Sequence, residues 1–517
     1  MQSSKWVWIL VGIALVIRLL MLTLHQAVEI DGAYYIAMGE NFIHGNGLKD
    51  IEGNVNTVFM PLYPILVGII SFLIKNGEMA ARLISVIFGA LLVLPVYGLA
   101  KRFYNEKIAL LAALIIAVYP ALAYISTIAY ADSLYIFLIT SAMYFGYQSL
   151  QTGKARHYLA TGACFSLAYL ARPEGWVYIP LVAAYMLWHK REHWKNAIKP
   201  VLSLLIIALL IALPYFIFSY AQAGDFSLSS KGYVIYKFRA YEPFSQEYES
   251  SIFSLNKAKD DILLNPYKVK GSLIQEILAN SQAFMLRYFS GLFKELYLVI
   301  PKVYPFIIFS LFAFFLRRWN REELKKESYL LMLVAYPLLF YPVFWVEARY
   351  MLPVIPVMTI WAGKGIVQIT QRWKRMPLAL IVAGILIFSL VGNVFASHLV
   401  DSRFEKVDPP LEHKQAGLWV RQNYDHPRIM ERKPWVSFYG KGEFVNFPYA
   451  IYSDLLQYAC NNDVDLIVVD ERYTKKLRPQ VAFLLEQETS ELHVVYGTNV
   501  RHQENDIVLY EIDCSRA

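Results

Sequence analysis

Long apolar segments alternate with short polar ones over the first 400 residues of the chain. Apolar runs of roughly 20 residues recur there, and each could cross about 30 Å of hydrocarbon. The pattern predicts a polytopic α-helical membrane protein with about eleven transmembrane helices. We expect these spans at Trp6–Leu24, Ala80–Ala100, Ile108–Ile125, Tyr130–Leu150, His157–Ala171, Gly175–Trp188, Ile198–Tyr220, Tyr288–Phe315, Ser328–Val346, Tyr350–Thr370 and Leu378–His398.

One apolar segment, Pro61–Lys75, is short and interrupted by proline, so we expect an interfacial or re-entrant helix there. With that choice, the loops rich in Lys and Arg all fall on one side of the membrane. By the positive-inside rule that side, together with the N-terminus, is cytoplasmic. The loops over 26–79 and 221–287 are then extracytoplasmic, as is everything after Val400. The basic loops are "KRFYNEK", "QTGKARH", "HKREHWKNAIK", "RRWNREELKK" and "QRWKR".

From Val400 the pattern changes to short β-branched runs and amphipathic helices. Strand-like runs are "PWVSFY", "DLIVVDE", "LHVVYG" and "DIVLYEI", with helices at "PPLEHKQAGLWVRQNY" and "YSDLLQYACNNDV". Strand, helix and strand in succession predict a small α/β domain with a partly parallel sheet. We therefore expect a membrane domain over 1–399 and an extracytoplasmic α/β domain over 400–517.

Composition agrees with a membrane protein, because 57% of the 517 residues are hydrophobic and 17% are charged. The net charge of +8 lies in short clusters between apolar runs, which argues against a nucleic-acid partner. Cys460 and Cys514 form either a disulfide outside the cytosol or two free thiols. No Cys/His cluster has zinc spacing, and no glycine-rich nucleotide loop is present.

Charged residues from separate loops are expected at the extracytoplasmic rim of the bundle. Ionisable groups at membrane depth are costly, so they mainly line a cavity or a site. The alternative is interfacial charge that caps the ends of spans, but the concentration of these residues favours a functional cavity. They are Asp31, Asp132, Arg172 and Glu174 in "ARPEG", and Glu347 and Arg349 in "VEARYMLP".

A carboxylate that faces cations beside a bilayer suits the transfer of a sugar from a lipid phosphate to an acceptor. Arginine or lysine would hold the phosphate and stabilise its developing charge. One carboxylate would act as general base on the opposite face of the sugar, which inverts the anomeric centre. Tyr34 and Tyr35 could stack on the sugar.

At these residues the membrane part of the chain resembles the GT-C glycosyltransferases. The resemblance is to the family 39-type branch, which includes protein O-mannosyltransferases and lipid A aminoarabinose transferases. It rests on the order of several loose motifs along the chain. They are "EIDGAYYIAMGENFIHGNGL", "PLYPIL", "MAARLISVIFGALLVLPVYGLAKRFY", "YADSLYIFL", "ARPEG" and "EARYMLPVIP".

The resemblance implies roles for single residues. Asp31 matches the first-loop carboxylate that acts as base, and Asp132 matches the acid of the second loop. Arg349 and Tyr350 match the motif near the donor phosphate. Relatives carry a Glu-Lys pair, tied to metal and phosphate, where this chain has Phe59 and Met60. The metal ligands are therefore unknown, and a divalent metal ion is the only cofactor left open.

The phosphate would then fall to Arg172, Lys231 or Arg349. Glu174 and Glu347 are expected to neutralise the neighbouring arginines, and Arg82 either snorkels or pairs with Asp31. The chain lacks the WWD signature of oligosaccharyltransferases, which argues against transfer of a whole glycan to Asn.

The sequence thus predicts an inverting glycosyltransferase that takes a sugar from a polyprenyl-phosphate donor. The acceptor would be a glycolipid, lipopolysaccharide or protein hydroxyl at the outer face of the inner or plasma membrane. Two alternatives stay open: a transporter or flippase of lipid-linked glycans, and a non-catalytic scaffold that binds them. A transporter would favour an internal repeat and midplane charges, whereas here no repeat is found and the polar residues gather at one face.

Overall fold

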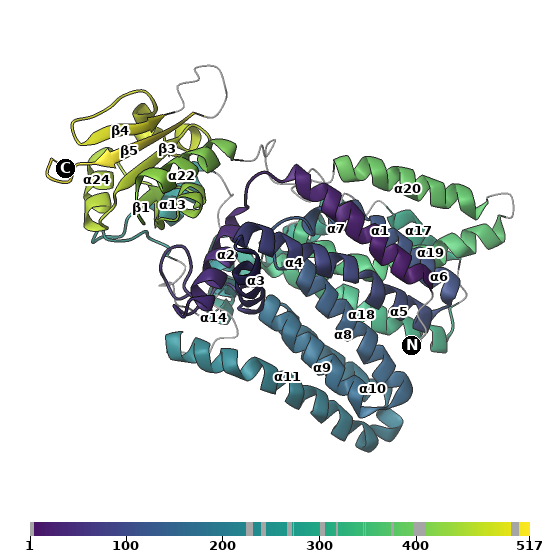
Figure 1. The fold of residues 1–517 in the computed structure, drawn as a ribbon. Coiled ribbons are helices and arrows are strands. Elements are labelled where there is room, and N and C mark those ends of the chain that lie inside the picture. The colour runs from purple at the N-terminus through teal and green to yellow at the C-terminus, as the bar shows by residue number, and fades with distance from the viewer. Residues whose placement is uncertain are drawn as a thin grey trace.

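The structure is a computed structural model, and it falls into a helical bundle and a C-terminal lobe (Figure 1). The N-terminal end of the first helix lies at the far end of the bundle from that lobe. The structure describes residues 5–223, 231–238, 245–265, 271, 273–299, 306–316, 319–344, 346, 348–373, 377–395, 410–497 and 506–516.

Helices in the first 400 residues follow the predicted apolar runs closely. They are α1 (Lys5–Met21), α2 (Ile30–Ile43), α3 (Leu62–Ile74), α4 (Gly77–Leu91), α5 (Val93–Phe103), α6 (Glu106–Val118), α7 (Pro120–Ile125), α8 (Asp132–Thr152), α9 (Ala155–Ala171), α10 (Gly175–His189), α11 (Trp194–Ala223), α12 (Lys231–Phe238), α13 (Gln246–Phe253), α14 (Leu273–Ala279), α15 (Ser281–Lys294), α17 (Ile307–Phe315), α18 (Arg321–Phe344), α19 (Ile355–Arg372) and α20 (Leu378–Val394). Short 3₁₀ turns lie at η1 (Leu22–Leu24), η2 (Arg191–His193) and η4 (Ala348–Val354), and η3 (Glu295–Val299) is a π-helical turn.

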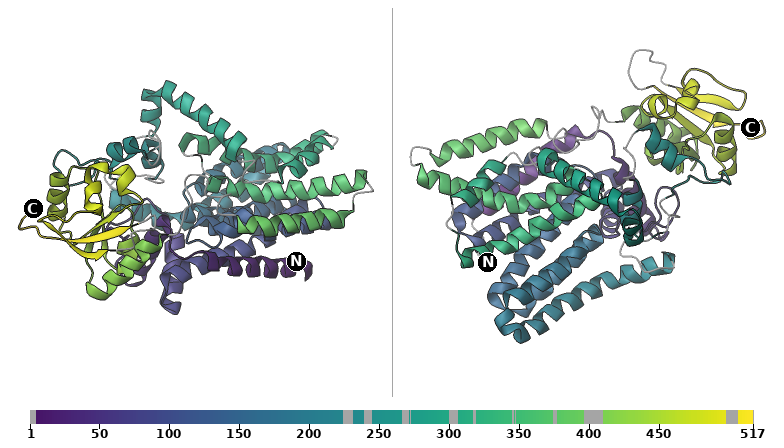
Figure 2. Two further views of the ribbon diagram at one scale, coloured as in Figure 1. Left: turned by 90° about the horizontal axis from the view of Figure 1, so that it is seen from above. Right: turned by 180° about the vertical axis from the view of Figure 1, so that it is seen from behind.

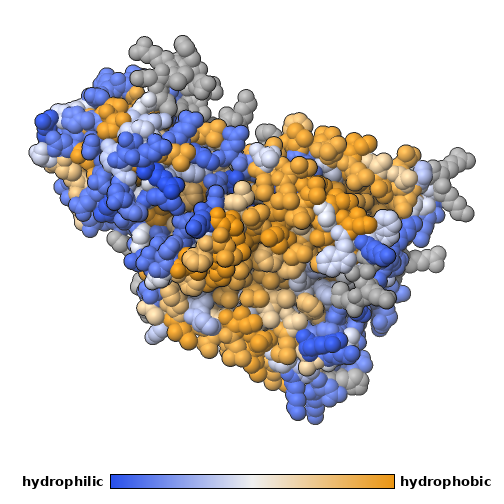
Figure 3. All heavy atoms as spheres, viewed as in Figure 1, coloured by the Kyte–Doolittle hydropathy of each residue, from blue (hydrophilic) through white to orange (hydrophobic). Residues whose placement is uncertain are grey.

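Within the described residues, five helical stretches are long and apolar enough to cross a membrane: Lys5–Leu24, Gly77–Phe103, Lys195–Gln222, Arg321–Phe344 and Arg349–Arg372. A broad apolar surface covers the bundle between the polar lobe and a polar far end (Figure 3). The chain is therefore a mostly helical, multi-pass membrane protein. The count of about eleven spans remains a prediction.

One predicted span is broken in the structure. The stretch expected over 108–125 divides into α6 and α7, because Tyr119 precedes a proline and takes an extended backbone. Of the stretch expected over 288–315, the structure describes α15, which begins earlier, the π-helical turn η3 and α17. Residues 300–305 of that stretch lie outside the described residues.

Helices α2 and α3 pack so closely that only glycines fit at their crossing. A Cβ atom on Gly39 would lie 2.4 Å from the carbonyl oxygen of Pro64, and one on Gly68 would lie 2.3 Å from the carbonyl oxygen of Gly39. With 13 residues, α3 is about 20 Å long, less than the hydrocarbon thickness. This length agrees with an interfacial or re-entrant helix, whose place in the bilayer remains a prediction.

The C-terminal lobe is a domain built on a mixed five-stranded sheet of order β2-β1-β3-β5-β4. Strands β2, β1 and β3 are parallel, whereas β5 runs antiparallel to β3 and β4, so the prediction of a partly parallel sheet is confirmed. The predicted boundary at residue 400 lies outside the described residues. The elements are α22 (Leu411–Asn423), β1 (Arg428–Glu431), α23 (Trp435–Gly440), β2 (Glu443–Asn446), α24 (Tyr452–Asn461), β3 (Leu466–Asp470), α25 (Thr474–Leu477), η5 (Pro479–Leu485), β4 (Leu492–Gly497) and β5 (Ile507–Ile512).

The run "PWVSFY", predicted as a strand, is helix α23. Its first backbone N–H groups have a partner, because the buried carboxylate of Glu431 accepts hydrogen bonds from the N–H groups of Val436 (2.9 Å) and Ser437 (2.7 Å). A carboxylate at a helix N-terminus satisfies donors that lack a partner within the helix. This contact overrides the β-propensity of the run.

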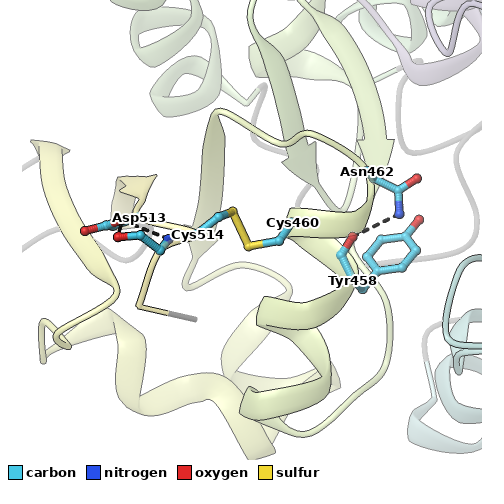
Figure 4. Close-up of a disulfide and its surroundings, with 6 residues drawn as sticks. Tyr458, Cys460, Asn462, Asp513 and Cys514 are labelled. Atoms are coloured by element: carbon cyan, nitrogen blue, oxygen red, sulfur yellow. Dashed lines mark hydrogen bonds between the residues drawn. A yellow bond between two sulfur atoms is a disulfide. The ribbon is translucent and has the colours of Figure 1, made fainter.

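A disulfide joins Cys460, near the end of α24, to Cys514, just after β5 (Figure 4). The third cysteine, Cys164, is a free thiol in α9. Of the two alternatives for Cys460 and Cys514, the structure therefore has the disulfide.

We predict that alkylation of denatured, unreduced protein modifies one thiol, and that reduction raises the number to three. Mass spectrometry of the intact chain counts them. The disulfide closes a loop with a sequence separation of 54, so Cys514→Ser should lower the free energy of unfolding of the C-terminal domain by about 4 kcal/mol. Cys164→Ser is the matched control. Three modified thiols before reduction would contradict the bond.

A second prediction concerns pH and the buried His413. Burial lowers the pKa of this imidazole, but hydrogen bonds to Asp470 and Glu412 outweigh burial and raise the pKa to about 9. A raised pKa stabilises the fold fully below the unfolded value of 6.5, and this contribution is lost as the pH rises through 9.

Between pH 6.5 and 9.5 the C-terminal domain should therefore lose up to about 3 kcal/mol of stability. His413→Gln should be less stable at low pH and should lose less as the pH rises. Hydrogen exchange of peptides from α22 in the whole protein measures the difference between the two proteins at each pH. Parallel pH curves for the two proteins would refute the prediction.

Candidate active site

Asp31 lies in the first turn of α2, at the end of the bundle nearest the C-terminal domain (Figure 1). Gly32 lets this turn pack against the loop before α8, since a Cβ atom there would lie 2.9 Å from the Cβ of Ala129. The Asp31 carboxylate accepts a hydrogen bond of 3.0 Å from Nη1 of Arg349, which lies in η4. The side chains of Asp31 and Arg349 are 25% and 17% exposed, so a solute can reach this ion pair.

A second ion pair lies deeper. Arg172 caps the end of α9 and donates a hydrogen bond of 2.7 Å to Asp132, the first residue of α8. The same guanidinium lies 3.2 Å from Glu174, which precedes α10. Arg172 and Asp132 are only 5% and 6% exposed, so this pair is a buried support and not a surface contact.

Tyr350 joins the two ion pairs. The guanidinium carbons of Arg172 and Arg349 each lie 5.1 Å from the centroid of its ring, within the range of a cation–π contact. Its hydroxyl accepts a hydrogen bond of 3.3 Å from Nη2 of Arg349, and its ring stacks on Tyr341 of α18 at 5.4 Å. Loops that are far apart in sequence thus meet in one cluster.

Tyr34 and Tyr35 are adjacent on α2 but face different surroundings. The hydroxyl of Tyr34 donates a hydrogen bond of 2.7 Å to Glu52 in the first loop. The ring of Tyr35 is 4% exposed and packs edge-on against Phe59 and Tyr63. Burial, followed by the charge of Asp31, raises the pKa of Tyr35 well above 10, so this phenol stays protonated beside the cluster. Stacking of either ring on a sugar remains a prediction.

The three remaining candidates are Arg82, which has other partners, and Lys231 and Glu347, whose side chains the structure does not describe. Arg82 forms an ion pair of 2.7 Å with Glu78 and donates hydrogen bonds to the carbonyl oxygens of His25 and Ala27. Lys231 begins α12, but its side chain lies outside the described residues, as does the whole of Glu347. The structure therefore brings together Asp31, Asp132, Arg172, Glu174, Arg349 and Tyr350 from the predicted set.

Sequence reasoning did not single out several residues that the structure places at the cluster. The guanidinium of Arg349 lies 5.0 Å from the ring centroid of Tyr130, and that of Arg172 lies 5.7 Å from the ring centroid of Tyr135. Both tyrosines were visible near Asp132 in "YADSLY". Lys433 of the C-terminal domain lies near none of the candidate residues in the sequence, so no local pattern pointed to it. Burial, together with the charge of Arg432, lowers the pKa of Lys433 to about 7, and the charges of Glu249 and Asp31 act against this shift.

A divalent metal does not fit the described residues around this cluster. Asp31 and Asp132 each face a guanidinium, and within the described ranges no three His, Cys, Asp or Glu side chains lie close enough to share a metal ion. Phe59 and Met60 supply no carboxylate where the resemblance led us to expect a Glu-Lys pair.

Comparison with known proteins shows one family that part of the chain is similar to. Residues 60–218 match the family described as dolichyl-phosphate-mannose-protein mannosyltransferase. No curated protein sequence matches the chain.

Three solved structures share the fold. The apo ArnT of Cupriavidus metallidurans is 14% identical with a TM-score of 0.61, and the match covers 98% of this chain and 97% of ArnT. The same enzyme bound to undecaprenyl phosphate is 14% identical, with a TM-score of 0.60 and 98% of both chains covered. An oligosaccharyltransferase of Archaeoglobus fulgidus, in complex with zinc and sulfate, is 16% identical with a TM-score of 0.59. That match covers 90% of this chain and 68% of the oligosaccharyltransferase chain.

At these identities the structural likeness concerns the fold. Together with the family match, it confirms the resemblance to the GT-C glycosyltransferases of the family 39 type. The predicted fold, a multi-pass helical membrane domain followed by a C-terminal domain with a mixed sheet, is confirmed.

The buried ion pair makes a prediction about stability. Asp132→Asn leaves the Arg172 guanidinium without its shorter carboxylate contact, and loss of one partner of a buried pair costs about 3 kcal/mol. Glu174→Gln should cost less, because that carboxylate is more exposed and lies farther away. Thermal unfolding in detergent, followed by tryptophan fluorescence, compares the variants with the fully exposed control Asp425→Asn. A larger loss for Glu174→Gln than for Asp132→Asn would refute this order.

Proposed function

We propose that this chain is an inverting glycosyltransferase that moves a sugar from a polyprenyl phosphate to an acceptor at the extracytoplasmic face of the membrane. The observation that carries the proposal is the accessible Asp31–Arg349 pair beside the buried Arg172–Asp132 pair, joined through Tyr350. A base and a phosphate-binding cation are thereby neighbours at one end of the bundle.

In the proposed reaction, a hydroxyl of the acceptor attacks the anomeric carbon of the donor sugar. The bond between that carbon and the phosphate oxygen breaks, and its electron pair leaves with the polyprenyl phosphate. Asp31 takes the proton of the attacking hydroxyl. It can do so only as an ionised carboxylate, and the salt bridge with Arg349 favours that form. Attack from the face opposite to the phosphate inverts the configuration.

Arg349 is the proposed phosphate ligand. Its guanidinium has five N–H donors in a planar fork that matches phosphate oxygens, and it is more exposed than Arg172. Arg172 remains paired with Asp132 and Glu174, and its guanidinium packs on the ring of Tyr350, which also contacts Arg349 and so helps to position the proposed phosphate ligand. No strong general acid is needed, because polyprenyl phosphate is a good leaving group.

The donor class agrees with two similar structures, ArnT bound to undecaprenyl phosphate and an archaeal oligosaccharyltransferase in complex with an inhibitory peptide and a dolichol-phosphate. The acceptor of this chain is proposed only by chemistry, as a hydroxyl of a glycolipid, lipopolysaccharide or protein. We propose likewise that residues 1–399 carry the site and residues 400–517 form the outer domain.

The proposed orientation has two supports. The basic loops of the sequence lie between spans on the side opposite to Asp31, as the positive-inside rule expects of the cytoplasm. The disulfide in the C-terminal domain suits an oxidising compartment. The N-terminus would then be cytoplasmic, in the inner or plasma membrane of the cell.

The proposal is tested with purified protein and a panel of polyprenyl-phosphate sugars, with release of the lipid phosphate followed by mass spectrometry. Asp31→Asn should lower kcat by about 10²–10⁴-fold while donor binding is retained, because the amide cannot take a proton. Asp463→Asn, at an exposed site, is the matched control. A product with retained anomeric configuration, or an Asp31→Asn variant with wild-type turnover, would overturn the mechanism.

The same experiment separates the alternatives. A transporter or a binding scaffold would bind the lipid-linked sugar without releasing polyprenyl phosphate in any arm of the panel.

A further inference from the structure

The segment His25–Glu29 connects η1 to α2 and forms neither helix nor strand. Its backbone groups need partners from elsewhere, since buried unpaired polar groups are costly. Val28 is 1% exposed, and it lies three residues before Asp31. Whatever holds this segment therefore also sets the position of the first turn of α2.

Side chains of the C-terminal domain supply much of that support. The indole N–H of Trp435 donates a hydrogen bond of 2.8 Å to the carbonyl oxygen of Val28. The hydroxyl of Tyr439 accepts a hydrogen bond of 2.8 Å from the N–H of the same residue. The ammonium of Lys414 donates a bond of 2.6 Å to the carbonyl oxygen of Gln26. Trp435 and Tyr439 are 6% and 7% exposed, so the two bonds to Val28 are shielded from water.

The bundle completes a closed ring of contacts around the segment. Tyr439 donates its hydroxyl proton to Glu78 at 3.3 Å, and Glu78 forms an ion pair of 2.7 Å with Arg82. Arg82 in turn donates to the carbonyl oxygen of Ala27 at 2.8 Å. This ring gives Arg82 a role that differs from ligand binding, because it anchors the segment before Asp31 from the membrane side.

The chain just before α23 also engages the large outer loop. Arg432 and Arg478 bind the fully buried Glu249 of α13 at 2.5 Å and 2.7 Å. Lys433, the next residue, lies close enough to Asp31 and Glu249 for both charges to act on its ammonium. The stretch 432–439 thus contacts the first loop on one side and the large loop on the other.

We propose that the C-terminal domain is a positioning element of the active site, in which Trp435 and Tyr439 clamp Val28 and thereby fix Asp31 against Arg349. The proposal rests on the proposed function, and it assigns Trp435 and Tyr439 as positioning residues that do not touch substrate. A carboxylate displaced by about 1 Å from its productive position can lose up to 10²-fold in rate, which is the physical basis of the expected effect.

The test uses the whole protein with the double variant Trp435→Phe/Tyr439→Phe, which removes both bonds to Val28, together with the bond of Tyr439 to Glu78, and keeps an aromatic ring at each position. Hydrogen exchange of a peptide that covers 24–36 should become faster. In the donor assay, kcat should fall about 10- to 100-fold, whereas the KM for the donor should change less than about twofold. If the two residues had a merely structural role, the variant would contain less active protein. Once the rate is divided by the titrated number of active sites, kcat and KM would then both be close to wild type.

The matched control is Trp419→Phe/Tyr452→Phe in the same domain. Trp419 packs on Tyr424 and Tyr496, and Tyr452 bonds to Thr489 and Glu491, so neither touches the first loop. This variant should keep wild-type exchange over 24–36 and wild-type kcat.

Unchanged exchange over 24–36 in the clamp variant would overturn the clamp, and faster exchange with wild-type kcat would overturn its positioning role. The proposed function fails separately, if the wild-type protein releases lipid phosphate from none of the donors. In that case hydrogen exchange still decides whether the clamp exists.

Discussion

Charged side chains inside an apolar bundle are costly unless an opposite charge neutralises them, and pairing of cations with carboxylates meets this constraint at the candidate site. Water cannot solvate a charge in such surroundings, so an unpaired one costs several kcal/mol. At the outer end, Arg172 is enclosed by Asp132 and Glu174, and Arg349 meets Asp31. A different cluster obeys the same rule elsewhere in the bundle, where the buried Glu327 binds Lys364 at 3.3 Å and the indole N–H of Trp361 at 3.0 Å.

The outer pairs differ from that second cluster in their access. Glu327 is 1% exposed, whereas a quarter of the Asp31 side chain is exposed. In the proposed mechanism, the donor phosphate replaces Asp31 as the partner of Arg349, and the Asp31 carboxylate then accepts the proton of the incoming hydroxyl. Pairing of Asp31 with Arg349 keeps both groups charged without burying an isolated charge.

The C-terminal domain continues the same network outside the bundle. Glu249 of the large loop, Glu40 of α2 and Glu78 of α4 all face cations or a hydroxyl of that domain. Figure 2 shows the domain at the same end of the bundle in two further views. The domain is thus attached through the loops that carry the candidate site, so its placement and the geometry of the site are linked.

The sequence by itself determined the apolar helices, the side on which the charged motifs gather and the mixed sheet. These follow from local properties: the length of an apolar run, the charge of a loop and the period of a strand. It also identified Asp31, Asp132, Arg172 and Arg349 as members of one cluster. Local pattern was wrong for "PWVSFY", where the carboxylate of Glu431 stabilises a helix.

Only the tertiary structure decided which carboxylate meets which cation. Arg349 and Asp31 are 318 positions apart, and Trp435 and Val28 are 407 apart, so no local pattern could pair them. Arg82 could have bonded Asp31 by charge alone, but α4 places it beside Glu78 and the carbonyl groups of the first loop. Such pairings depend on packing between elements, because electrostatic and hydrogen-bond energies act over a few ångströms and not along the chain.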